Sequence, residues 1–270
     1  MKREEIADLI YQKIKQNIVY LKKQFEASNN EIGFLYIDDL LPKELALEIY
    51  QKFPNTKETI KRDSLRELKY TAFQMDKYDS ILEEVIYAFQ EKIIVDLFSE
   101  ICKIPNMYAD EKLYAGGLSL MEKGNFLNPH LDNSHDKDRN RWRVLNLLYY
   151  VTPNWQLDFG GNLEVWPKGL KQDPLTIESK FNRLIVMATH NNSWHSVNKV
   201  ATDKIRCCVS NYYFSDEPLL TSDTFHVTTF RGRPKEKIKD FILQVDNKLR
   251  QSLRILFKKG VRENPHQYKK

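Results

Sequence analysis

The sequence predicts an α+β protein in which a jelly-roll core, or double-stranded β-helix, lies between N-terminal supporting helices and a C-terminal helix. The core is expected over residues 114–216, where short apolar segments rich in β-branched and aromatic residues are separated by Gly, Pro, Asn and Asp. Such a series of strands without intervening helices is typical of sandwiches and barrels. On both sides of this region, apolar residues instead recur at helical spacing. A jelly roll leaves a mouth in which a small ligand can bind.

The strands expected in the core are six short segments. In chain order, starting near Tyr114, they read LYAGGLSLM, RVLNLLYYV, NLEVWP, LTI, RLIVMA and KIRCCVSNYYF.

Residues 1–113 are expected to support the core as part of the same domain. An apolar stripe predicts a helix over residues 3–24; its members are Ile6, Leu9, Ile10, Ile14, Ile18 and Leu21. The segment IGFLYIDDLLP predicts a short strand, and KELALEIYQKF after it predicts a second helix. Residues 55–70 are polar and poorly patterned, which favours a loop, whereas residues 81–102 predict one long helix.

Residues 217–270 are expected to form a C-terminal helical extension. Its helix shows an apolar stripe, and the opposite, basic face is expected to point into solvent. The stripe consists of Ile238, Phe241, Ile242, Val245, Leu249, Leu253 and Leu256. The segment FRGRPKEKIKD before this stripe is expected to cap the barrel.

Composition excludes several classes of protein. The chain has 270 residues and a net charge of +5, which is too modest to indicate nucleic acid as a partner. Its three cysteines, Cys102, Cys207 and Cys208, offer no disulfide framework, and this favours a reducing compartment. The N-terminus lacks the apolar run of a signal peptide, and no segment approaches transmembrane length. We therefore expect a cytoplasmic protein with no membrane partner.

The segment NPHLD predicts a metal site. In a strand, side chains two residues apart point the same way, so His130 and Asp132 can converge on one ion. His195, just before the last strand, is the best third ligand, although His135 and His190 compete for this role. Two histidines and one carboxylate form the facial triad of non-haem Fe(II) oxygenases. The same ligand types also suit zinc.

Arg206 adds a second indication. It opens the strand that follows His195, and a strand-borne arginine at the mouth of a β-core can hold a carboxylate through two parallel hydrogen bonds. The cosubstrate 2-oxoglutarate needs such a cation for its distal carboxylate. A surface arginine in a salt bridge is the alternative interpretation. Lys204 shares the face of Arg206 and is the competing candidate.

Several motifs in order resemble a known family. HLDNSHDKDRNRWRVLNLLYYVTPNW, FGGNLEVWPKG, IESKFNRLIVMATHNNSWHSV and RCCVSNYYF are similar to the prolyl 4-hydroxylase group of Fe(II)/2-oxoglutarate dioxygenases. They most resemble the branch that contains the oxygen-sensing prolyl hydroxylases of animals. The resemblance covers roughly residues 115–216 and leaves out both helical ends.

The resemblance implies a role for each matching residue. His130, Asp132 and His195 match the iron ligands, and Arg206 and Tyr150 match the residues that bind the distal carboxylate of 2-oxoglutarate. Three further matches complete the cosubstrate pocket. Gly160–Gly161 match a tight turn, Leu163 matches an apolar wall, and Ser210 matches a small hydroxyl residue.

One departure concerns the residue beside the metal. The family usually has a tyrosine about ten residues before the first histidine, and here Leu120 or Met121 takes its place. The affinity for the cosubstrate and the polarity around the iron are therefore expected to differ from those of the family.

The resemblance also implies the reaction. Fe(II), 2-oxoglutarate and O2 are expected to hydroxylate an unactivated C–H bond with release of succinate and CO2, with ascorbate as the reductant. The expected substrate is a prolyl residue of a protein or peptide, and the alternative is a small molecule such as a free amino acid or a glycan precursor. Two further alternatives are a non-catalytic, cupin-like binding protein and a zinc hydrolase, and the second gives Arg206 no role.

Overall fold

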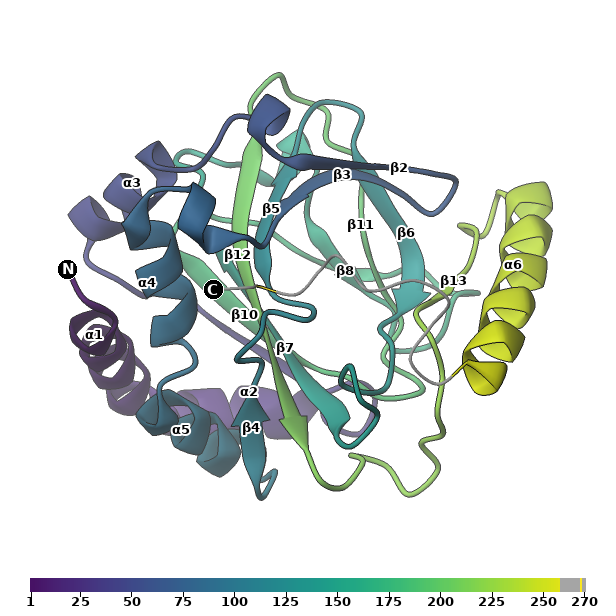
Figure 1. Cartoon of the computed structure of the whole chain (residues 1–270), viewed down its shortest axis with the longest axis horizontal. Coiled ribbons are helices and arrows are strands. Elements are labelled where there is room, and N and C mark those ends of the chain that lie inside the picture. The colour runs from purple at the N-terminus through teal and green to yellow at the C-terminus, as the bar shows by residue number, and fades with distance from the viewer. Residues whose placement is uncertain (258–267, 269–270) are drawn as a thin grey trace.

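The computed structural model describes residues 1–257 and residue 268. The strands within these residues are β1 (Phe34–Ile37), β2 (Ile60–Asp63), β3 (Glu67–Ala72), β4 (Met107–Ala109), β5 (Gly117–Met121), β6 (Phe126–Leu131), β7 (Trp142–Tyr150), β8 (Leu163–Val165), β9 (Leu175–Ile177), β10 (Arg183–Ala188), β11 (His195–Val197), β12 (Arg206–Ser215) and β13 (Thr229–Phe230). They pair antiparallel in one curled sheet of order β1-β10-β7-β12-β5-β3-β6-β11-β8-β9, with β13, β2 and β4 at its margins (Figure 1). The predicted jelly roll is confirmed.

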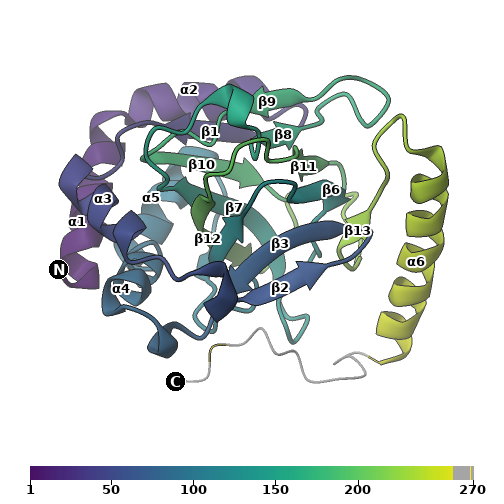
Figure 2. The same ribbon diagram turned by 90° about the horizontal axis from the view of Figure 1, so that it is seen from above.

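Helices lie on two sides of this sheet. They are α1 (Arg3–Gln16), α2 (Ile18–Ser28), α3 (Lys43–Gln51), α4 (Ser80–Ala88), α5 (Lys92–Cys102) and α6 (Lys237–Leu256). The first five gather on one side, whereas α6 stands alone at the opposite end of the molecule (Figures 1 and 2). None of the described helices has the length and apolar character needed to cross a membrane.

The alternation of side chains along β7 separates the core from the ligand cavity. Leu145, Leu147 and Tyr149 are buried in the apolar cluster that also contains the inner faces of α1, α4 and α5. Leu148 and Tyr150, one residue along, point to the other face of the sheet and line a cavity. Because successive side chains of a strand point to opposite faces, one strand supports the helices and also shapes the cavity.

The structure differs from three predictions for the N-terminal segment. Residues 55–70 are not a loop, because β2 and β3 form a hairpin whose second strand also pairs with β5 and β6. These long-range pairings stabilise strands whose local sequence carries no apolar pattern. Residues 81–102 are two helices rather than one, since the backbone is extended at Glu91, where α5 begins. The stripe over residues 3–24 is likewise divided between α1 and α2 at Asn17.

The C-terminal helix forms as predicted but faces the opposite way. The buried residues of α6 are Leu243 and Asn247, and its polar side contacts the body of the protein. The apolar stripe points outward, with exposed fractions from 45% at Ile242 to 81% at Ile238. The expectation of a solvent-facing basic side is therefore wrong. The extension beyond Phe257 lies outside the described residues, apart from Tyr268.

Candidate metal and cosubstrate site

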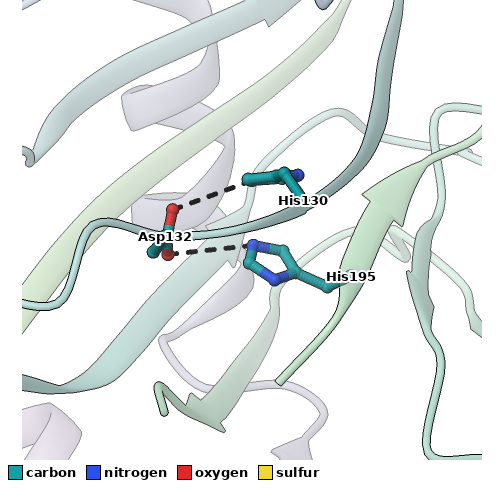
Figure 3. Close-up of side chains that lie close together, drawn as sticks. All are labelled: His130, Asp132 and His195. Carbon is teal, nitrogen blue, oxygen red and sulfur yellow. Dashed lines mark ion pairs between the residues drawn. The ribbon is translucent and has the colours of Figure 1, made fainter. Parts of the chain in front are cut away.

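Three of the predicted site residues meet at one point of the sheet. His130 lies near the end of β6, His195 opens β11, and the two are directly paired across these antiparallel strands. Their ring centroids are 4.0 Å apart. Asp132 follows β6 immediately, and its Oδ1 and Oδ2 lie 3.7 Å from Nε2 of His130 and of His195, respectively (Figure 3). The register of two strands thus brings together residues that are far apart in the sequence.

The hydrogen bonds of the two histidines use Nδ1 and leave Nε2 of each ring free to bind a metal. Nδ1 of His130 contacts the Asn128 carbonyl oxygen and Nδ1 of His195 contacts that of Ser193, both at 2.9 Å. A carbonyl oxygen only accepts, so each Nδ1 carries the proton and each Nε2 keeps its lone pair. These lone pairs point toward Asp132. A backbone carbonyl on the far nitrogen is the usual support of a metal-binding histidine.

The electrostatics of the cluster suit a divalent cation. Burial, followed by the neighbouring His195, lowers the pKa of His130 to about 3. Burial alone would raise the pKa of Asp132, but the charges of His195, Arg143 and His130 hold it below its usual value. A neutral imidazole and an ionised carboxylate are the forms that bind metal. Among the described residues, only these three form such a group of potential ligands.

The competing histidines lie elsewhere. His190 is committed to the backbone, since its Nε2 contacts the Ile32 carbonyl oxygen at 2.9 Å and its Nδ1 accepts from the Asn192 amide. His135 packs against the ring of Phe225, with the ring centroids 4.6 Å apart. Neither histidine belongs to the cluster.

The cluster opens into a cavity of about 460 Å³ between the two walls of the curled sheet. Arg206, Tyr150, Leu163 and Ser210 all line this cavity, as predicted for a cosubstrate pocket. Lys204 is instead exposed, and its Nζ lies 3.4 Å from the Asn154 carbonyl oxygen. Arg206, but not Lys204, therefore lines the same cavity as His130, Asp132 and His195.

Arg206 and Tyr150 each have a buried polar group without a hydrogen-bond partner among the described residues. Arg206 is only 4% exposed, and its Nη1 donates to the Gly161 carbonyl oxygen at 3.0 Å. Its Nε and the hydroxyl of Tyr150 are buried without a hydrogen-bond partner among the described residues. Buried polar atoms are nearly always paired in proteins, so these two donors indicate a missing acceptor. The distal carboxylate of 2-oxoglutarate fits this need.

Comparison with known proteins agrees with this chemistry. Residues 116–214 match the family described as the 2OG-Fe(II) oxygenase superfamily. That segment belongs to this superfamily. The family implies Fe(II), 2-oxoglutarate and O2, and an oxidoreductase of the dioxygenase class. No curated protein matches the chain.

Solved structures share the oxygenase fold. A prolyl-4-hydroxylase from Pseudomonas putida is 15% identical with a TM-score of 0.54, over 72% of this chain and 98% of its own. A prolyl hydroxylase from Trichoplax adhaerens, in complex with a hypoxia-inducible-factor peptide, is 20% identical with a TM-score of 0.50, over 74% and 92%. The epimerase SnoN of nogalamycin biosynthesis is 11% identical with a TM-score of 0.51, over 73% and 84%. At these identities, the likeness is one of fold.

The structure also decides which residue replaces the tyrosine of the family. Met121 lines the cavity and is fully buried, whereas Leu120 points into the helical core. The thioether of Met121 therefore occupies the position at which the resemblance implied a tyrosine, and it makes this wall of the cavity less polar.

Arg143 is a site residue that the sequence analysis missed. It is 5% exposed, its Nη1 lies 3.8 Å from Oδ1 of Asp132, and its Nε is buried without a partner among the described residues. Strict alternation from Tyr150 would place Arg143 on the outer face. The pairing of β7 with β12 skips Val144, and this bulge turns Arg143 into the cavity.

Further basic side chains surround the cavity. Seven basic residues line it, against the two acidic residues Glu67 and Asp132. The basic residues are Arg62, Arg66, Lys69, Arg143, Arg206, Arg250 and Arg254. Arg62, Arg66 and Lys69 were missed because residues 55–70 were predicted to be a loop. Arg250 and Arg254 were missed because the basic side of the C-terminal helix was predicted to face solvent.

Proposed function

We propose that the protein is an Fe(II)- and 2-oxoglutarate-dependent dioxygenase that hydroxylates an unactivated C–H bond. The observation that carries this proposal is that the group of His130, Asp132 and His195 lies in the same cavity as the buried Arg206, whose Nε has no partner among the described residues. When bound, iron, 2-oxoglutarate and dioxygen supply the oxidation that puts one oxygen atom into the C–H bond, with succinate and CO2 as the other products.

The residues of the chain hold and orient the reactants. His130, Asp132 and His195 are assigned as the iron ligands, with the tautomers of both imidazoles fixed by backbone carbonyls. Arg206 and Tyr150 are assigned to the distal carboxylate, which would satisfy both of their unpaired donors. Leu163 is assigned to an apolar wall of the cosubstrate pocket and Ser210 to its polar lining; the Ser210 hydroxyl donates to the Gly117 carbonyl oxygen at 3.1 Å.

The basic lining favours an anionic substrate. With Asp132 bound to a dication, the guanidinium of Arg143 loses its counter-charge and can bind a carboxylate of the substrate. Arg66 and Arg250 share Asp246, and Lys69 is paired with Glu67, so Arg143 is the cation best placed for this role. A prolyl residue in an acidic peptide is the first candidate substrate. A small anionic molecule is the second.

An anaerobic titration tests the cosubstrate site. We would add Fe(II) and then 2-oxoglutarate to the metal-free protein and record the visible charge-transfer band of the chelated complex. We expect a band with wild-type protein, no band with Asp132→Ala, and a band that needs far more 2-oxoglutarate with Arg206→Ala. Lys204→Ala is the matched control and should titrate like the wild type. Wild-type protein that binds iron but gives no band would refute the proposal.

Substrate screening follows with the loaded enzyme. Succinate release would be measured, with ascorbate as the reductant, on proline-containing peptides that differ only in acidic or neutral residues, and on small carboxylates. We expect turnover of acidic members and a raised KM with Arg143→Met. Equal turnover of acidic and neutral members would contradict the assignment of Arg143.

A further inference from the structure

The outward face of α6 is apolar over its whole length. We call the side chains of the predicted stripe the apolar face of α6; they are Ile238, Phe241, Ile242, Val245, Leu249, Leu253 and Leu256. All seven are exposed by 45% or more, and Ile255 and Phe257 extend the exposed surface at the C-terminal end. On a helix of 20 residues the stripe is about 30 Å long and covers about a third of the circumference.

Specific hydrogen bonds fix this orientation. The amide of Asn247 donates to the Phe230 carbonyl oxygen at 2.6 Å and accepts from the Phe230 amide at 3.0 Å. The amide of Gln251 bonds in the same two-sided way to the Phe225 carbonyl oxygen and the Val227 amide. Turning the helix over would leave these backbone groups unpaired, at a substantial cost for those that are buried. The apolar face is therefore held outward by the polar side.

The charges that accompany the apolar face have one sign. The exposed charged residues of the helix are Lys237 and Lys248, and the exposed Lys235 precedes them. Both acids of the helix are turned toward the body: Asp240 is paired with Arg231, and Asp246 is paired with Arg66 and Arg250.

No described part of the chain covers this face, since all seven of its side chains are exposed. Residues 258–267 read KKGVRENPHQ and contain a single large apolar residue, Val261. If a second copy of the chain packed its α6 antiparallel on this face, Lys237 and Lys248 of the two helices would lie along the same edge, and like charges oppose such an association. An exposed apolar patch of this size normally marks an interaction surface.

We propose that α6 binds to an anionic lipid surface and lies in the plane of the interface. An amphipathic helix with Phe, Leu and Ile on one face and lysines beside them enters the boundary between headgroups and acyl chains, and anionic lipids strengthen this binding. The helix is not apolar enough to cross a membrane. A peripheral contact of this kind needs no membrane-spanning helix, and it does not depend on the proposed oxygenase activity.

Vesicle binding of the full chain tests the proposal. Sedimentation with vesicles of phosphatidylcholine and phosphatidylglycerol would be compared with phosphatidylcholine alone. We expect binding to the anionic vesicles, weaker binding at high salt, and about tenfold weaker binding for Leu249→Glu and for the double variant Lys237→Glu/Lys248→Glu. Leu249 is 62% exposed, so the folded protein should tolerate the change.

Val19→Glu is the matched control. Val19 is 66% exposed on α2, which lies away from α6 in both views, so this variant should bind vesicles like the wild type (Figures 1 and 2). Thermal unfolding would confirm that every variant is folded. The proposal would be overturned if folded wild-type protein did not bind anionic vesicles, or if the Leu249→Glu variant bound them as well as the wild type does. A dimer in light scattering that separates with Leu249→Glu, without vesicle binding, would assign the face to a second copy.

Discussion

Replacing Arg206 with methionine tests whether this residue binds the cosubstrate or stabilises the fold. The substitution keeps the length of the side chain but removes its charge and its donors. Arg206 makes one hydrogen bond to the protein, to Gly161, and its Nε has no partner among the described residues. Without 2-oxoglutarate, a buried cation with so few partners contributes little to folding, because its desolvation offsets its contacts. We therefore expect the melting temperature of the ligand-free protein to change little.

The loss should instead appear in cosubstrate binding. Two charge-assisted hydrogen bonds to a carboxylate contribute about 1.5–3 kcal/mol each, so losing both weakens binding by at least about 3 kcal/mol, or roughly two orders of magnitude. Anaerobic calorimetric titration of 2-oxoglutarate into metal-loaded protein measures this change, and Lys204→Met is the control. A large drop in the melting temperature together with less than a fivefold loss of affinity would show that Arg206 is structural.

Three more predictions follow from groups described above. Tyr150→Phe removes a hydroxyl without a partner, so calorimetry should show about tenfold weaker 2-oxoglutarate binding and chemical denaturation an unchanged stability. Asn247→Leu leaves two backbone groups of Phe230 unpaired, and limited proteolysis should then release α6 faster than in the wild type. Burial, and next the charge of Arg143, lower the pKa of His135 to about 3. The unfolded state therefore binds more protons between about pH 6.5 and 3, and the unfolding free energy should fall as pH falls through this range, less steeply in His135→Asn. Urea denaturation at several pH values measures this dependence. If the unfolding free energies of the wild type and of His135→Asn fell equally steeply with pH, the assignment to His135 would be contradicted.

Alternation and motif order were enough to predict the centre of the site. The strand β7 has the expected face with Leu148 and Tyr150 in the cavity, and the pairing of β6 with β11 joins the predicted histidines. Arg143 could not be found in this way, because one unpaired residue in β7 reverses the alternation before it. A bulge of this kind depends on the partner strand, which local sequence does not describe.

The hairpin and the C-terminal helix show a second limit. Strand β3 is stabilised by its neighbours β5 and β6, which are distant in sequence, so its polar composition gave no signal. For α6, amphipathicity predicted a helix but not which face is covered. That choice depends on polar groups such as Asn247 and Gln251, which bond to the main chain of residues 225–230. An apolar stripe indicates the inner face only where no such polar anchors compete.

The wall of the cavity has a practical consequence for trimming the protein. Residues 116–214 carry the family match, but β3 lies outside them and fills the space between β5 and β6. A chain cut to this segment would expose the edges of both strands, and unpaired edges promote aggregation. It would also lose Lys69 from β3 and Arg250 from α6, and with them part of the positive charge around the cavity. A shortened chain for expression should therefore keep both β3 and α6.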